Sequence, residues 1–82
     1  MSTWTVYILK CKDDSLYTGI TTDLEARIEA HNRGDGAKYT RGRGPVRLVW
    51  SQDDLSESQA RKREYEIKQL SRAQKLELIS AS

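Results

Sequence analysis

Cysteine and proline each occur only once in this chain of 82 residues. The lone Cys11 excludes an internal disulfide, and by itself it cannot supply a zinc site of the Cys/His type. No apolar run approaches the ~20 residues that a membrane span needs, and the N-terminus lacks the pattern of a secretory signal. We therefore expect a cytoplasmic protein with no membrane partner, folded as a single domain over residues 1–82.

Most of the chain has no excess of positive charge, because the excess is confined to one stretch. The formal net charge is +2, yet residues 33–47 carry five basic residues against one acid, together with four of the five glycines. The glycine spacing does not match the GxxxxGK[ST] pattern of a nucleotide-binding loop. A basic cluster of this kind indicates an anionic partner, most often nucleic acid, whereas the alternative is a flexible solvated loop. The candidate contact residues are Arg33, Lys38, Tyr39, Arg41 and Arg43, with the tyrosine available to stack on a base.

Two short segments near the N-terminus predict a β-hairpin. Residues 4–11 and 16–21 are rich in β-branched and aromatic residues, and residues 12–15 have turn chemistry that we expect to be centred on Asp14. Because side chains alternate along a strand, Tyr7 and Tyr17 share a face only if the loop has an odd number of residues or contains a bulge. A third strand is expected at residues 46–51, followed by a turn at residues 52–55.

Three capping-box patterns predict where helices begin. They are Thr22 to Glu25, Ser56 to Gln59 and Ser71 to Gln74. The first helix should end near Asn32, before Gly34, and the last should turn Leu76 and Ile79 inward. The predicted fold class is therefore α+β, a three-stranded antiparallel sheet flanked by helices in the order β-β-α-β-α-α.

The first predicted helix carries polar residues on its inward stripe. Leu24, Arg27, Ile28 and His31 follow the i, i+3, i+4, i+7 spacing that normally holds apolar side chains. A histidine can exchange a proton near neutral pH, and the arginine fork suits phosphate oxygens, so the stripe indicates a site. The alternative is a surface arginine and a solvated histidine at the end of the stripe.

The second predicted helix places an acid beside its apolar stripe. Ala60, Glu64 and Ile67 are spaced at i, i+4 and i+7, although periodicity alone does not choose between Glu57, Glu64 and Glu66. Glu64 could form an ordinary surface pair with Lys68. Its carboxylate could also hold Mg²⁺ or Mn²⁺, because these hard ions keep several waters and need few protein ligands.

Taken together, these residues resemble the GIY-YIG nuclease domain. The resemblance rests on Thr5-Val6-Tyr7, Tyr17-Thr18-Gly19, Arg27 with His31, and the later Glu64, and it is closest to the small stand-alone bacterial branch, whose relatives include excision-repair and intron-encoded endonucleases. It implies a metal-dependent endonuclease that hydrolyses DNA phosphodiester bonds with one divalent ion, Mg²⁺ or Mn²⁺. The implied site consists of catalytic Tyr7, Tyr17, Arg27, His31 and Glu64, with Glu64 as metal ligand and Gly19 allowing close backbone approach to the substrate.

Within this resemblance, Tyr7 would take the proton from the attacking water, which requires its pKa of about 10 to be lowered by the nearby cation. A polar residue beyond the acid, Lys68 or Gln69, would complete the site. The alternative function is a non-catalytic nucleic-acid-binding module on the same scaffold. Single-stranded, duplex and branched DNA all stay open as substrates, as does a homodimer or a partner protein.

Overall fold

The computed structural model describes residues 3–34 and 44–81, and these form a three-stranded sheet with three helices. In chain order the elements are β1 (Trp4–Lys10), β2 (Leu16–Thr21), α1 (Leu24–Asn32), β3 (Arg47–Leu55), α2 (Glu57–Lys68) and α3 (Arg72–Ala81). The central strand is β1, and both of its neighbours run antiparallel to it. The predicted α+β class and the order β-β-α-β-α-α are confirmed.

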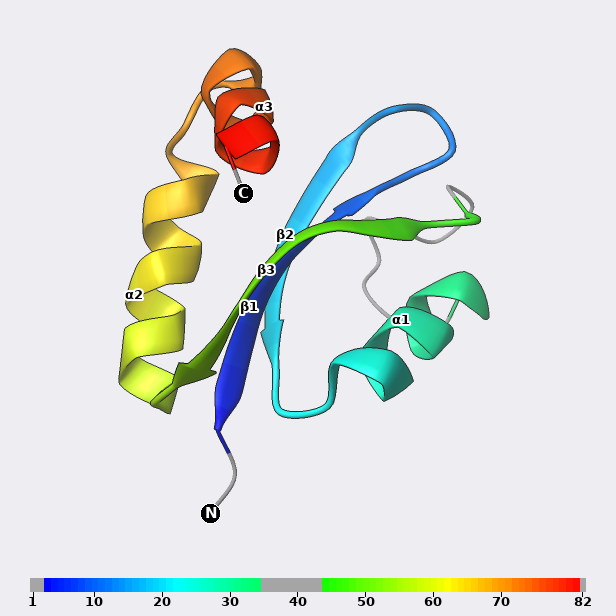
Figure 1. The fold of residues 1–82 in the computed structure, drawn as a ribbon. Helices are drawn as coiled ribbons and strands as arrows, with labels where there is room; N and C mark the ends of the chain where they lie inside the picture. The colour runs from blue at the N-terminus through cyan, green and yellow to red at the C-terminus, as the bar shows by residue number, and fades with distance from the viewer. Residues whose placement is uncertain (1–2, 35–43, 82) are drawn as a thin grey trace.

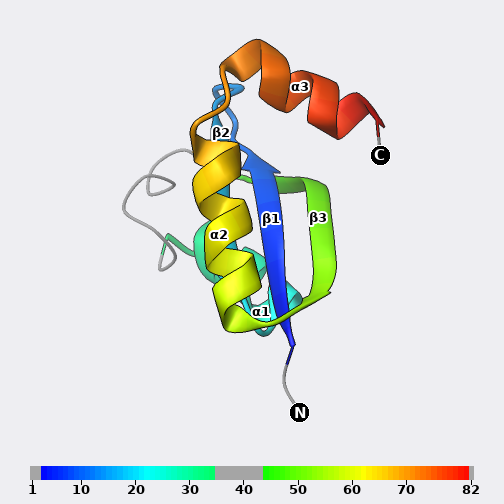
Figure 2. The ribbon, with the colours of Figure 1, turned by 90° about the vertical axis from the view of Figure 1, so that its left-hand side faces the viewer.

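The sheet is covered on both faces, with α1 on one side and α2 on the other (Figure 1). Viewed from the α2 side, this helix lies in front of the sheet, and α3 continues beyond its C-terminal end (Figure 2). Val6 and Ile8 of β1 pack with Ala60 and Ile67 of α2. Tyr7, Leu9 and Cys11 point to the other face, toward Leu24 and Ile28 of α1. Because β1 is buried on both faces, its sequence is almost uniformly apolar.

The β1–β2 hairpin brings the two tyrosines to the same face. Asp14 has a positive φ of 67°, and the Cys11 N–H donates to the Ser15 carbonyl at 2.9 Å, which closes the turn. Tyr7 lies directly opposite Gly19, and Tyr17 is two residues before that glycine on the same strand. Since strand side chains alternate, Tyr17 shares the face of Tyr7, as the sequence required of a common site.

The start of α1 differs from the prediction. Asp23, not Thr22, is the N-cap, and its side chain accepts the Ala26 N–H at 3.2 Å. The Thr21 hydroxyl accepts the Asp23 N–H at 3.1 Å and so helps to hold the capping residue in an extended conformation. The predicted end at Asn32 is confirmed, and Gly34 follows with a φ of 83°.

The third strand is longer than predicted, because residues 52–55 continue β3 rather than forming a turn. These residues pair with the beginning of β1, where Leu55 lies opposite Trp4 and Gln52 opposite Val6. The ladder shifts register between these pairs, and Asp54 has a positive φ of 62°. Long-range pairing with β1 therefore overrides the local turn composition.

The last two helices begin as predicted. Ser56 and Gln59 form the complete capping box of α2, and Ser71 and Gln74 exchange the same two hydrogen bonds before α3. The predicted inward edge of α3 is only half right, because Ile79 packs on the core whereas Leu76 is 39% exposed. In the described part of the chain, none of the helices is long and apolar enough to cross a bilayer.

Candidate active site

A buried polar cluster lies between the sheet and α1. The Tyr7 hydroxyl and His31 Nε2 are 3.1 Å apart, and these side chains are 0% and 1% exposed. The ring of Tyr17 completes the cluster, with its centroid 5.1 Å from that of His31 and 6.3 Å from that of Tyr7. Three side chains from three elements, β1, β2 and α1, thus meet within hydrogen-bond or ring-contact distance.

Gly19 provides the space that the Tyr7 phenol occupies. A Cβ at this position would lie 2.6 Å from the Tyr7 hydroxyl oxygen and 2.8 Å from its Cζ, closer than real Cβ atoms approach. The glycine was expected to let the backbone approach a substrate. The structure gives a different reason for it, namely that the tyrosine lies directly across it from the neighbouring strand.

Arg27 belongs to the same cluster. It lies one helical turn before His31 on the stripe that faces the sheet, where Leu24 and Ile28 also pack. Its hydrogen bond and its charge both act to lower the pKa of Tyr7. Its Nε is buried without a hydrogen-bond partner among the described residues. The alternative of a solvated histidine at the end of a surface stripe is therefore wrong, since His31 is buried.

The cluster favours the neutral forms of its two titratable members. Burial makes the largest contribution and raises the pKa of Tyr7. The hydrogen bond and charge of Arg27 act to lower this pKa, whereas the charges of Tyr17 and Glu64 add smaller contributions that raise it. Burial and the Arg27 charge lower the pKa of His31. A neutral imidazole has an unprotonated nitrogen, so His31 can accept a hydrogen bond from the Tyr7 hydroxyl.

Glu64 is supplied by α2, which packs on the other face of the sheet and contacts both β1 and β2. Its side chain is only 22% exposed, and its carboxylate pairs with the Lys68 ammonium at 3.2 Å. Its negative charge makes a small contribution to the raised pKa of Tyr7. Of the other candidate acids, Glu57 pairs with Arg61 and Glu66 lies beside Arg63.

The residues present fit a divalent ion that keeps most of its waters. Within residues 3–34 and 44–81, no three His, Cys, Asp or Glu side chains gather into a multi-ligand centre. Mg²⁺ does not require one, because it is commonly held by one or two carboxylates together with substrate phosphates. The Glu64 carboxylate already has a cation, the Lys68 ammonium, at one of its oxygens.

The predicted nucleic-acid contacts are only partly covered by the structure. Arg33 is exposed and forms the C-cap of α1, directly after the helix that carries His31. Lys38, Tyr39, Arg41 and Arg43 lie outside the described residues.

Asn32 makes a long-range hydrogen bond that the sequence reasoning missed. Its Oδ1 accepts the Val46 N–H at 2.7 Å, which fastens the start of β3 to the end of α1 beside His31. The two residues are 14 positions apart, and no motif connects them, so the sequence carried no signal for this bond.

A known family matches the part of the chain that carries this cluster. A model of the GIY-YIG catalytic domain matches residues 3–77, and the chain therefore belongs to the GIY-YIG family. It is 64% identical over 76 residues to a UPF0213 protein of Clostridium perfringens, covering 93% of this chain and 82% of that protein. A UPF0213 protein of Halobacterium salinarum is 59% identical over 70 residues, covering 85% of this chain and 91% of that protein.

Solved structures agree with this assignment. The solution structure of a UPF0213 protein from Bacillus halodurans has a TM-score of 0.65 at 54% identity, covering 98% of this chain and 85% of that one. A second solution structure, from E. faecalis, has a TM-score of 0.64 at 35% identity, with coverage of 98% and 86%. The predicted kinship with small stand-alone GIY-YIG proteins is thus confirmed.

Proposed function

We propose that this protein is a divalent-metal-dependent endonuclease that hydrolyses phosphodiester bonds in DNA. Membership of the GIY-YIG family supports the reaction class. The observation that carries the proposal is the buried contact between the Tyr7 hydroxyl and His31 Nε2 at 3.1 Å. Burying two titratable groups costs stability unless they are satisfied, and a module that only bound nucleic acid would have no need of them.

The Tyr7–His31 pair accepts the proton of the attacking water. Burial raises the pKa of Tyr7, so this phenol alone is a poor acid in the uncomplexed protein. The adjacent imidazole is neutral at physiological pH because its pKa is lowered. Tyr7 passes its hydroxyl proton to Nε2 as its oxygen takes the proton of water, so the negative charge on the tyrosine never accumulates.

Arg27 and Tyr17 bind the phosphate. The arginine Nε is buried without a partner among the described residues, so a phosphate oxygen that reached it would satisfy an otherwise unpaired donor. The guanidinium adds a positive charge where negative charge develops during hydrolysis. The Tyr17 hydroxyl donates to a second phosphate oxygen on the same face of the sheet.

Glu64 would hold the single divalent ion, Mg²⁺ or Mn²⁺. When bound, such an ion supplies Lewis-acid polarisation of the scissile phosphate and charge stabilisation of the leaving oxygen. The carboxylate is 22% exposed on α2, and it would hold the ion in place of the Lys68 ammonium. Glu64 lies on α2, whereas Tyr7 and His31 lie on β1 and α1, so separate substitutions test the two roles.

The basic segment that includes Arg33 and continues through Lys38, Tyr39, Arg41 and Arg43 holds the DNA backbone around this site. Single-stranded and structured DNA are candidate substrates alongside duplex DNA. A second copy of the chain or a partner protein would add affinity.

The experiment is a cleavage screen of single-stranded, duplex and branched DNA with Mg²⁺ or Mn²⁺, comparing Tyr7→Phe with Tyr65→Phe. Tyr65 is 67% exposed on α2, so it is a matched control for the same chemical change. We expect Tyr7→Phe to reduce the rate about 10²–10⁴-fold and Tyr65→Phe to leave it unchanged. Failure of the folded wild-type protein to cleave any of these DNA forms would overturn the proposal, as would equal rates in the two variants.

A further inference from the structure

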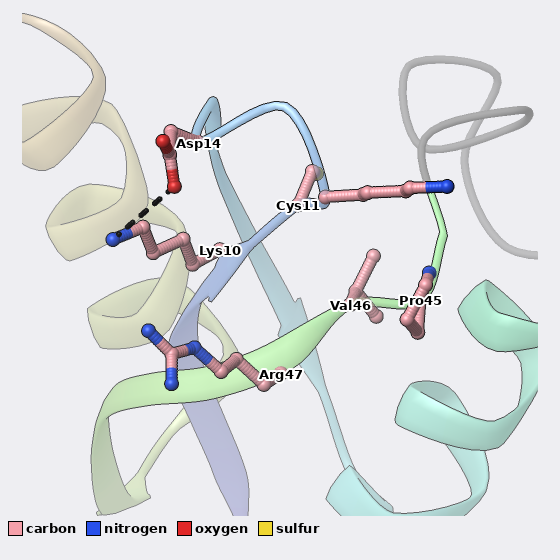
Figure 3. A pocket seen from close by; sticks show the side chains of 7 residues that line it. Lys10, Cys11, Asp14, Pro45, Val46 and Arg47 are labelled. Carbon is pink, nitrogen blue, oxygen red and sulfur yellow. Dashed lines mark ion pairs between the residues drawn. The ribbon is translucent and has the colours of Figure 1, made fainter.

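A pocket outside the tyrosine–histidine cluster lies where β1 ends and β3 begins (Figure 3). It has a volume of about 270 Å³ and is open to solvent. Three of the residues that line it are cationic, Lys10, Lys12 and Arg47, against a single carboxylate, Asp14. None of the catalytic residues proposed above lines this pocket.

Two of these cations stand directly opposite each other across the strands. Lys10 of β1 and Arg47 of β3 are register partners, and their side chains project to the same side (Figure 3). Like charges in this position are destabilising in a sheet. Asp14 approaches the Lys10 ammonium at 3.4 Å, but its side chain is 73% exposed, so water largely screens this ion pair. A bound anion would relieve the repulsion that the fold otherwise carries.

The floor of the pocket is held rigidly by the fold. Cys11 is 3% exposed and Val46 is 5% exposed. The Cys11 N–H is bonded within the hairpin turn, and the Val46 N–H is bonded to Asn32 at 2.7 Å. The cations therefore project from a fixed backbone, which lowers the entropic cost of binding a ligand between them.

The same hydrogen bond connects the pocket to the candidate active site. Asn32 follows His31 directly at the end of α1, so the floor of the pocket is fastened to the helix that carries the histidine. Lys10 and Arg47 project on the face of the sheet opposite the tyrosines, so a strand of nucleic acid would reach them by passing around this end of the sheet.

We propose that this pocket binds a backbone phosphate of the nucleic-acid strand at a position flanking the scissile bond. The inference rests on the proposed function for the identity of the ligand, whereas the pocket itself requires only a phosphate. The planar fork of Arg47 is suited to two oxygens of one phosphate, and the Lys10 ammonium adds a point charge beside it. The pocket is open to solvent, so a phosphate can enter it while it remains part of a nucleic-acid strand.

The test is equilibrium binding of fluorescein-labelled single-stranded and duplex oligonucleotides, followed by anisotropy in EDTA so that no cleavage occurs. The variant is Lys10→Gln/Arg47→Gln, and the matched control is Arg61→Gln/Lys62→Gln, which removes the same charge from exposed positions on α2. We expect the pocket variant to raise Kd about tenfold and to reduce the slope of log K against log salt by about 0.7 to 0.9, as loss of one neutralised phosphate predicts. The control variant should change both quantities much less.

Thermal unfolding provides a second readout. Because the substitutions remove a like-charge pair, the pocket variant should be at least as stable as the wild type, whereas cations with a structural role would leave it less stable. Oligonucleotide affinity equal to that of the control variant would overturn the proposal. It would also be overturned if inorganic phosphate bound to the wild type and not to the pocket variant while oligonucleotide affinity stayed the same, since the pocket would then be a free-phosphate site.

These outcomes are separable from the fate of the proposed function. A wild-type protein that cleaves DNA, with a pocket variant that binds it normally, contradicts the pocket alone. A folded wild-type protein that neither binds nor cleaves any DNA contradicts both.

Discussion

Replacing Gly19 by alanine should distort the Tyr7–His31 contact without altering either residue. The new Cβ would lie 2.6 Å from the Tyr7 hydroxyl oxygen and 3.1 Å from the Tyr17 ring, whereas ordinary contact begins at 3.4 Å. The phenol must therefore retreat by about 0.8 Å, the difference between the first and last of these distances. Tyr7 is fully buried, so no open space receives it.

Overpacking of this kind costs about 1–3 kcal/mol in free energy of unfolding. In a domain of this size each kcal/mol lowers the melting temperature by about 4–8 °C. The displaced hydroxyl also moves relative to His31 Nε2, so DNA cleavage should fall together with stability.

Circular dichroism during urea and thermal unfolding measures the loss, and Gly44→Ala is the matched control. At that position the nearest atom to an added Cβ is the Asn32 carbonyl oxygen at 4.0 Å, so stability should change little. Combining Gly19→Ala with Tyr7→Leu removes the phenol that the Cβ would meet, and the added cost of the alanine should then shrink. An equal cost in both backgrounds, or no cost in the wild-type background, would refute the steric explanation.

Two further predictions concern the N-terminal cap of α1 and the pH dependence of the free energy of unfolding. Asp23→Ala should lower the free energy of unfolding by about 1 kcal/mol through loss of the α1 cap, whereas Thr22→Ala should change it little; the reverse order in urea titrations would restore Thr22 as the cap. His31 is the only histidine, and its pKa is lowered in the folded protein, so the unfolded chain takes up the proton first. Stability should therefore be complete above about pH 6.5 and decline as pH falls toward 5. His31→Gln should lack this decline, and an identical acid dependence in both proteins would contradict the assignment.

The sequence was most informative where local chemistry decides the structure. The run from Trp4 to Lys10 was predictable as a buried strand because both of its faces meet a helix. The caps at Ser56 and Ser71 were predictable because each is completed within four residues. At the start of α1 two adjacent residues, Thr22 and Asp23, could both cap, and the pattern favoured the wrong one.

Long-range contacts decided the parts of the fold and of the candidate site that the sequence did not predict. The extension of β3 to Leu55 depends on pairing with Trp4, which local turn composition does not reveal. Helical spacing predicted that Arg27 and His31 face inward, but not that the imidazole meets Tyr7 at 3.1 Å. Nor could spacing distinguish Glu64 from Glu57 and Glu66, because the lower exposure of its side chain, 22% against 51% and 52%, depends on how α2 packs.

The most direct test of the account is the rate of DNA cleavage as a function of Mg²⁺ or Mn²⁺ concentration in the wild type, Glu64→Gln and Glu66→Gln. Glu66 is an exposed acid on the same helix, so its variant controls for the loss of one charge from α2. We predict that wild-type cleavage requires the ion, that Glu64→Gln loses at least about 100-fold in rate, and that Glu66→Gln cleaves normally. Cleavage by Glu64→Gln at the wild-type rate, or cleavage that persists in EDTA, would contradict the account.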